Sequence, residues 1–278
     1  MPRKYSLWPT LGTVGLLMVI VLTACDLNFN ADDNPVSSGN EVYELLRWRD
    51  PDEAIDVVFA PDEDYGDLTN DTNRQDFLDD IADLIDSGFW QNNGLASNIA
   101  AVNFWFMIDS GDVAEGEGIC PDVTWPDLTN ANFAEVIVLV HPNSLRDCRW
   151  GNKVTTEPFS YRTVVHEFSH AAFNLPDEYC CDGGYWNVSP VMYGSNSACT
   201  SDAANSAWRD CQQLSSGSDT VNRWRSEGAN SDIMRSAGST VWEYGPADWV
   251  VVDNVLNGLA GLSVQTPEVF APDNWDWP

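Results

Sequence analysis

Two histidines and a glutamate between residues 160 and 180 have the types and spacing of a metal-dependent hydrolase. The segment reads SYRTVVHEFSHAAFNLPDEY, in which His166 and His170 are four residues apart and Glu167 follows the first histidine. On an α-helix such histidines lie about 40° apart around the axis and roughly 6 Å apart along it, so both imidazoles can bind one metal ion. Glu167 is then placed to accept a proton from a metal-bound water. This HExxH arrangement is typical of zinc hydrolases, so we expect a Zn²⁺ cofactor and Glu167 as the catalytic base.

A catalytic zinc site with three protein ligands needs one more donor. The only other histidine is His141, at the end of an apolar run, whereas Asp177 and Glu178 follow His170 by seven and eight residues. Asn174 tolerates the left-handed conformation that would turn the chain back toward the metal. Asp177 is the first side chain after that turn with a ligand atom, so we expect it to be the third ligand. Glu178 is the alternative ligand, or it orients a ligand histidine.

The elements that must position these residues follow from the hydrophobic pattern. Ser160 is a good N-cap, and the apolar residues after it recur at helical spacing up to Leu175, which predicts a buried helix face. Apolar residues between 73 and 89 have the same spacing, with acidic residues between them, which predicts an amphipathic helix. A further helix is expected over 246–256. Apolar runs at 54–61, 100–108 and 133–140 predict buried strands, with an edge strand between Gly151 and Pro158. This order favours an α/β domain with a mostly parallel sheet, followed by an irregular region after residue 180.

The cysteines predict three disulfides. Apart from Cys25 the chain has six, an even number that suits an oxidising compartment. We expect Cys120 to pair with Cys148, and Cys180 and Cys181 each to pair with Cys199 or Cys211. A cysteine-ligated zinc site is the less favoured alternative, because the chain has no CxxC pair.

The N-terminus has the pattern of an export signal. Arg3 and Lys4 precede an apolar run over 11–24 that is too short to span a bilayer as a helix. The run ends in Leu-Thr-Ala-Cys, which resembles a bacterial lipobox, so we expect a signal peptide over 1–24 and a lipid anchor on Cys25. A plain secreted protein is the alternative. A polar tether is expected over 25–40, a catalytic domain over 41–262 and an extended tail over 263–278.

The charge restricts the partners. The chain of 278 residues has 43 acidic and 13 basic side chains, a formal charge of -30, and 44% of its residues are hydrophobic. Such a chain can form a core but repels nucleic-acid phosphates, so we expect no nucleic-acid partner. A surface of this kind stays soluble in salt and suits an exported protein of a saline habitat.

The motif HEFSHAAFNLPDEY resembles the HExxH-x(6)-DEY signature of the igalysins, the IgA-peptidase-type zinc metallopeptidases of the metzincin group. The resemblance extends upstream to IDVVFAPDEDY and VNFWF and downstream to SDIMRS, over roughly residues 54–256. It implies a metzincin-like α/β protease domain with an active-site helix, an irregular disulfide-linked C-terminal subdomain, and a methionine turn beneath the metal. Met234 fits that methionine, with Met192 as the rival. The chain has Ser169, Phe173 and Asn174 where family members usually have glycine, and Pro176 precedes the acidic pair.

We therefore expect an exported monomeric zinc endopeptidase, anchored at the cell surface or in the periplasm, that hydrolyses a protein or peptide substrate with a Glu-activated zinc-bound water. Tyr179 or Tyr244 could stabilise the oxyanion. One alternative is a non-catalytic surface-binding lipoprotein that keeps the zinc-protease fold. Another is an acidic calcium-dependent module, but the Asp-rich stretch 62–86 has no DxDxDG loop.

Overall fold

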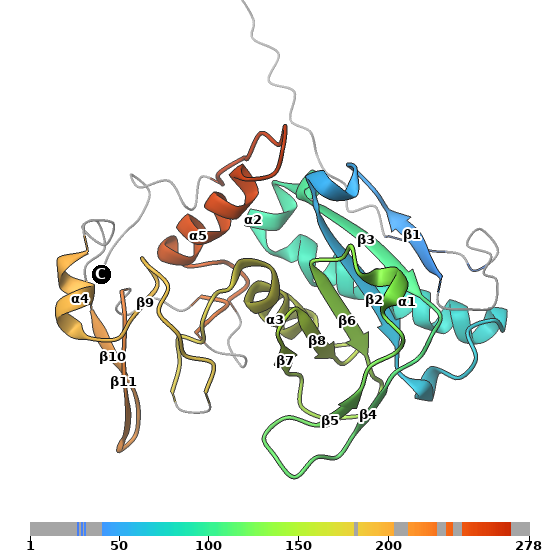
Figure 1. The fold of residues 1–278 in the computed structure, drawn as a ribbon, viewed down its shortest axis with the longest axis horizontal. Coiled ribbons are helices and arrows are strands. Elements are labelled where there is room, and N and C mark those ends of the chain that lie inside the picture. The colour runs from blue at the N-terminus through green and yellow to red at the C-terminus, as the bar shows by residue number, and fades with distance from the viewer. Residues whose placement is uncertain are drawn as a thin grey trace, which may run out of the picture.

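The central element is a mostly parallel six-stranded sheet in the order β1-β3-β2-β6-β8-β7 (Figure 1). The computed structural model describes residues 27, 29, 31, 41–180, 183–202, 211–226, 232–235 and 241–267. The parallel strands are β2 (Ile55–Pro61), β3 (Val102–Met107), β6 (Val136–Val140) and β8 (Lys153–Thr156). At the two edges, β1 (Val42–Leu46) and β7 (Arg149–Trp150) run antiparallel to their neighbours.

The sheet is covered on both faces, which explains why the inner strands β2, β3 and β6 are mostly apolar without alternation. On one face, Val57, Phe59 and Phe104 pack with α1 (Asp71–Ser87) and with α3 (Tyr161–Phe173), in a core that contains Phe77, Phe89 and Phe168. On the other face, Val58, Ala60, Ile137 and Leu139 pack against residues from the connection between β3 and β6. That connection contains the two-stranded ribbon of β4 (Asp112–Ala114) and β5 (Asp122–Thr124).

Short elements link the main ones. Two α-helical segments are α2 (Asn93–Ala96) and α4 (Asn196–Ser201). The 3-10 turns are η1 (Pro51–Glu53), η2 (Glu63–Tyr65), η3 (Phe89–Gln91), η4 (Ile99–Ala101) and η5 (Thr129–Ala131).

The C-terminal part forms a second lobe beside the sheet (Figure 1). It contains α4, a three-stranded sheet in the order β10-β11-β9, and the helix α5 (Pro246–Asn257), which packs near α3. The strands are β9 (Met192–Tyr193), β10 (Gln212–Ser216) and β11 (Asp219–Arg225). The expectation of an irregular region after residue 180 was therefore incomplete. The β10–β11 hairpin is largely exposed and polar, so it lacks the apolar alternation by which strands are recognised.

The predicted edge strand is a second point of correction. Residues 153–156 form β8, which lies inside the sheet, because the chain turns at Gly151 (φ 69°) and adds β7 as the true edge. Two buried threonines make β8 look polar in sequence. Thr155 uses its hydroxyl to accept a hydrogen bond from the Cys148 amide at 3.0 Å.

Two disulfides are defined between described cysteines. Cys120 bonds to Cys148, as predicted. Cys199 bonds to Cys211, which corrects the expected pairing of these two with Cys180 and Cys181. The reason is local: Cys199 in α4 and Cys211 at the start of β10 lie with their Cα atoms 5.9 Å apart. Cys180 is also disulfide-bonded, and Cys181 lies outside the described residues.

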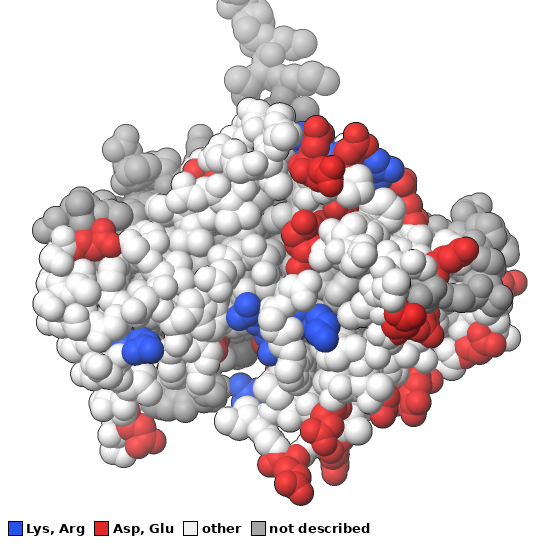
Figure 2. Space-filling view, viewed as in Figure 1, with Lys and Arg blue, Asp and Glu red and all other residues white. Residues whose placement is uncertain are grey.

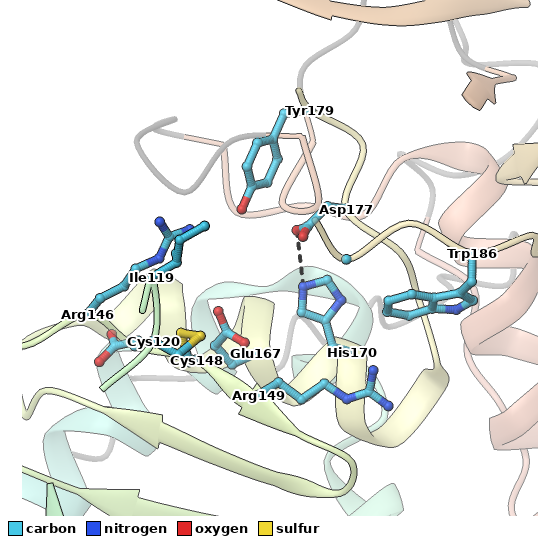
Figure 3. Close-up of a pocket in the computed structure, with 12 residues that line it drawn as sticks. Ile119, Cys120, Arg146, Cys148, Arg149, Glu167, His170, Asp177, Tyr179 and Trp186 are labelled. Carbon is cyan, nitrogen blue, oxygen red and sulfur yellow. Dashed lines mark ion pairs between the residues drawn. A yellow bond between two sulfur atoms is a disulfide. The ribbon is translucent and has the colours of Figure 1, made fainter. Parts of the chain in front are cut away.

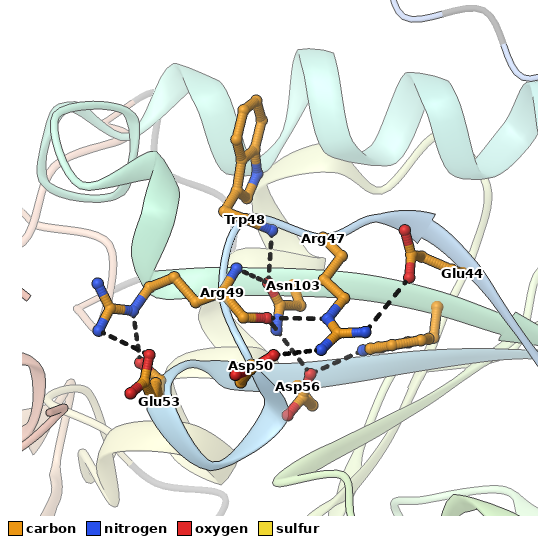
Figure 4. Close-up of polar contacts among 9 residues, drawn as sticks. Glu44, Arg47, Trp48, Arg49, Asp50, Glu53, Asp56 and Asn103 are labelled. Carbon is orange, nitrogen blue, oxygen red and sulfur yellow. Dashed lines mark hydrogen bonds and ion pairs between the residues drawn. The ribbon is translucent and has the colours of Figure 1, made fainter.

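The connection from β1 to β2 is fixed by a polar cluster around Asn103 (Figure 4). The Asn103 side chain accepts from the Trp48 amide at 2.9 Å and donates to Asp56 Oδ1 at 3.0 Å. Trp105 Nε1 donates to the same Asp56 oxygen at 2.7 Å. Arg47 lies at the surface of this cluster, where it forms ion pairs with Glu44 and Asp50.

The predicted signal peptide and Cys25 lie outside the described residues. Of the predicted tether over 25–40, the structure describes Leu27, Phe29 and Ala31, and these pack on the domain. Phe29 and Ala31 are buried, and the side chain of Gln75 on α1 bonds to the backbone of both. Among the helices that the structure describes, none has the length and apolarity needed to cross a bilayer.

Candidate metal centre

Helix α3 presents the two motif histidines at the junction of the lobes. Ser160 precedes the helix as predicted, although its hydroxyl donates to Glu157 and does not cap the helix. Val164, Val165 and Phe168 hold the helix against the sheet, and His166 and His170 are buried one turn apart. The Nε2 atoms of the two histidines lie 3.1 Å apart, so α3 aims both imidazoles at one point.

Asp177 completes a three-residue group at that point. Its Oδ1 lies 3.2 Å from His166 Nε2 and 3.2 Å from His170 Nε2. Four ligands placed tetrahedrally at about 2.0 Å from zinc would be about 3.3 Å apart, close to these separations. The structure thus brings together His166, His170 and Asp177. Figure 3 shows the contact between the last two.

The hydrogen bonds of the two histidine Nδ1 atoms suit a group that binds a cation. His166 Nδ1 lies 2.9 Å from the Ile233 carbonyl, and His170 Nδ1 lies 2.5 Å from the Leu175 carbonyl. A carbonyl only accepts, so each Nδ1 carries a proton, and in its neutral form each imidazole directs an Nε2 lone pair at the shared point. Three lone-pair atoms then converge in a buried site, and a bound cation offsets their repulsion. Two imidazoles and a carboxylate are ligands that Zn²⁺ prefers.

The electrostatics of the group follow from this convergence. Burial by itself would raise the pKa of Asp177, but when His166 and His170 are protonated, their hydrogen bonds and positive charge lower that pKa far below its usual range. Burial would lower the pKa of His166, yet the carboxylates of Asp177 and Glu167 and the Ile233 carbonyl raise it.

A left-handed turn after α3 returns the chain to the histidines. Asn174 has φ 56° and ψ 35°, as predicted, and stands where the resemblance implies glycine. The Asp177 amide then donates to the Gly184 carbonyl at 3.1 Å. Gly184 has φ 69°, and a Cβ atom there would overlap with Asp177 Oδ2. Only glycine therefore leaves room for the carboxylate, and this role is not visible in the motif.

The turn at 232–235 supports the group from the C-terminal lobe. Its Ile233 carbonyl accepts from His166, and its Met234 carbonyl accepts from the Glu178 amide at 3.0 Å. Arg162, one turn before His166 on α3, donates from Nη2 to the Ile233 carbonyl at 2.8 Å. Met234 is fully buried in this turn, whereas Met192 is buried in β9. Arg162 is a second residue that sequence reasoning missed.

Glu178 lies in a different cluster from Asp177. Its carboxylate lies 3.6 Å from Arg235 Nε, and it forms a buried acidic group with Asp232 and Asp248. Arg235 is also 3.8 Å from Asp232 Oδ2. The backbone of Glu178 thus ties the turn at 232–235 to the ligand loop, while its side chain pairs with Arg235.

Glu167 borders a pocket of about 300 Å³ (Figure 3). One wall comes from Ile119, the Cys120–Cys148 disulfide and Arg149, and the other from Tyr179, Gly184 and Trp186. Burial raises the pKa of Glu167, and the two histidines partly oppose that rise. Among the described residues no hydrogen bond or ion pair engages its carboxylate, so it is available to a molecule in the pocket.

Of the other predicted candidates, Tyr179 lies at the pocket, and Tyr244 and His141 do not. Tyr179 lines the pocket, with its ring centroid 6.2 Å from that of His166. Tyr244 is buried, its hydroxyl is bonded to Ser169 at 2.8 Å, and it does not line the pocket, so the expectation of an oxyanion role for Tyr244 was wrong. His141 is buried beside Asp147, at 3.2 Å, away from the His166 group.

Comparison of the chain with protein-family models and with curated proteins gives no match.

Proposed function

We propose that the protein is a zinc-dependent endopeptidase. The observation that carries the proposal is the buried convergence of His166 Nε2, His170 Nε2 and Asp177 Oδ1, with separations of 3.1 to 3.2 Å. In this proposal the three side chains hold Zn²⁺. When bound, the metal acts as a Lewis acid that polarises the substrate carbonyl and makes water a better nucleophile.

The residues of the chain then have separate tasks. Glu167 takes the proton from the attacking water and passes it to the leaving amine, a role that suits a carboxylate with a raised pKa and no other partner among the described residues. Tyr179, which lines the pocket, donates to the developing oxyanion in this proposal. The Ile233 and Leu175 carbonyls hold the histidines in the required tautomer.

The fold supports a metzincin-like assignment within this proposal. A sheet with an active-site helix, a ligand loop that returns after a left-handed turn, and Met234 in a turn bonded to the ligand residues are the features that the igalysin resemblance implies. Disulfides such as Cys120–Cys148 and Cys199–Cys211 are typical of an extracytoplasmic compartment. We include export through the signal peptide at 1–24 and a lipid anchor at Cys25 in the proposal.

The test is hydrolysis of casein and a peptide library by the zinc-loaded soluble domain, with and without a chelator. Glu167→Gln should keep zinc and thermal stability but lose at least about 100-fold in turnover, because a general base commonly contributes 10²- to 10⁴-fold. Glu44→Gln makes the same change at an exposed ion pair and should leave turnover intact. Zinc binding without hydrolysis in the parent would favour the non-catalytic alternative, and turnover of Glu167→Gln within tenfold of the parent would remove Glu167 from its role.

A further inference from the structure

Positively charged side chains are scarce in this molecule, and most of the described arginines already form ion pairs or hydrogen bonds within the protein. Against 43 acidic side chains the chain has 13 basic ones. On the face shown in Figure 2, red side chains gather toward one side and the lower margin, while blue ones surround the central hollow. Most described arginines outside the pocket have clear partners: Arg47, Arg49, Arg74 and Arg235 pair with carboxylates, and Arg162 donates to carbonyls.

Arg149 differs from these residues. It lies on the edge strand β7, is half-buried, and lines the pocket with Glu167 and His170. Its Nε donates to the Gly151 carbonyl at 2.5 Å, and its Cζ lies 5.2 Å from the Trp186 ring centroid. Among the described residues no carboxylate pairs with it, and its two terminal nitrogens make no hydrogen bond. A half-buried guanidinium therefore keeps free donors within the pocket.

The guanidinium is held in place next to the metal ligands. Trp186 Nε1 donates to the Asn174 carbonyl at 2.9 Å, which fixes the indole at the end of α3. The centroid of the same indole lies 5.9 Å from that of the His170 ring, so Arg149 and His170 both lie next to Trp186 (Figure 3). A guanidinium stacked on an aromatic ring keeps its edge available for bidentate bonds to a carboxylate.

We propose that Arg149 binds a carboxylate of the substrate, so that the enzyme prefers peptides with a carboxylate within one or two residues of the scissile bond. This inference rests on the proposed function. The carboxylate has two possible sources, an Asp or Glu side chain or the C-terminal carboxylate of the peptide, and both offer the same pair of acceptors. Arg146, which is exposed at the rim of the same pocket, adds positive charge on the side of Ile119.

The experiment measures binding separately from hydrolysis. Zinc-loaded Glu167→Gln is titrated by calorimetry at 150 mM NaCl with end-blocked peptides that differ only in Glu or Gln next to the cleavage position. A third peptide is neutral with a free C-terminal carboxylate, and its C-terminal amide is the reference. The same titrations are repeated with Arg149→Gln, Arg149→Lys and Arg47→Gln added to that background. Arg47 is the matched control, because it lies near β1 at the opposite edge of the sheet.

We expect one carboxylate peptide to bind about tenfold more tightly than its neutral reference. Arg149→Gln should reduce this ratio to below about threefold, Arg149→Lys should keep part of it, and Arg47→Gln should keep all of it. A preference in the Glu/Gln pair would identify a side-chain carboxylate as the source, and a preference in the acid/amide pair would identify the C-terminal carboxylate. A parent ratio near one, or a ratio unchanged in an Arg149→Gln variant that melts like the parent, would overturn the inference. Failure of the parent to hydrolyse any peptide would count against the proposed function, while the calorimetric ratios would still decide the role of Arg149.

Discussion

At the scale of single residues, the site depends on which nitrogen and oxygen atoms of each side chain are not used in hydrogen bonds with the rest of the protein. His166 and His170 donate their Nδ1 protons to carbonyls, and this frees both Nε2 atoms for a metal. Asp177 directs one oxygen at the same point. Glu167, one residue from His166, keeps a carboxylate without a partner among the described residues. In the proposed mechanism, the difference between the ligand Asp177 and the base Glu167 is therefore set by direction and bonding, because both have the same functional group.

Gly184 gives a prediction at this scale. Gly184→Ala should weaken zinc binding by about 10- to 100-fold, because the added methyl would displace the Asp177 carboxylate. Gly151→Ala is the matched control, since Gly151 has the same φ of 69° but an added methyl there would meet no atom within 4 Å. Competition with a chromogenic chelator gives both affinities. Equal zinc affinity in the two variants would show that contact with Asp177 does not matter.

The HExxH motif and the acidic pair were enough to predict the three grouped residues, because helical spacing and one turn determine where they lie. Gly184 and Arg162 could not be predicted in this way. Gly184 contacts Asp177 through the fold of a loop, and Arg162 reaches carbonyls about 70 residues away in sequence. Neither contact leaves a periodic or spacing signal in one sequence.

At the scale of elements, the pocket is formed by segments from both lobes. Strand β7 and the β4–β5 connection form one wall, and the loop after α3 forms the other. Sequence patterns predicted the inner strands β2, β3 and β6 and the long helices, because their burial makes them apolar. They did not predict β7, β10 and β11, which have polar residues and depend on turns at Gly151 and Gly217 for pairing.

The Cys120–Cys148 disulfide gives the prediction for this scale. Replacing both cysteines by alanine should lower the free energy of unfolding by roughly 3–4 kcal/mol, because the bond closes a loop of 28 residues. It should also lower kcat/KM by about tenfold, since the bond holds the pocket wall that contains Ile119.

The matched variant replaces Cys199 and Cys211, whose bond closes a loop of 12 residues and does not line the pocket. It should cost roughly 3 kcal/mol of stability but leave kcat/KM of the folded protein unchanged. Chemical denaturation and peptide hydrolysis measure the two effects. A similar loss of kcat/KM in both variants would contradict the role of the first disulfide as a pocket wall.

At the scale of the whole molecule, the dominant feature is excess negative charge. Several carboxylates are also buried or half-buried, among them Asp56, Asp62 and Asp80, and burial raises the pKa of each. A carboxyl whose pKa is higher in the folded state binds more protons there. It therefore favours folding at low pH, and this contribution is lost as the pH rises through the folded-state pKa.

Asp56→Asn tests this balance. The amide keeps an oxygen to accept from Asn103 and Trp105 and removes the charge (Figure 4). The variant should be more stable than the parent at pH 8, by roughly 1 kcal/mol or less, and the gain should shrink toward pH 5. Thermal melts at both pH values measure the difference. A variant that is destabilised equally at both would show that the charged form of Asp56 does not destabilise the fold.

The central claim is that His166, His170 and Asp177 hold one zinc ion, and a zinc titration of parent, Asp177→Ala and Glu178→Gln tests it most directly. The account predicts one Zn²⁺ per parent chain, a loss of more than about 100-fold in affinity for Asp177→Ala, and a change of less than tenfold for Glu178→Gln, whose side chain pairs with Arg235. Parent-like zinc affinity in a folded Asp177→Ala variant would contradict the account, and the proposed peptidase mechanism with it.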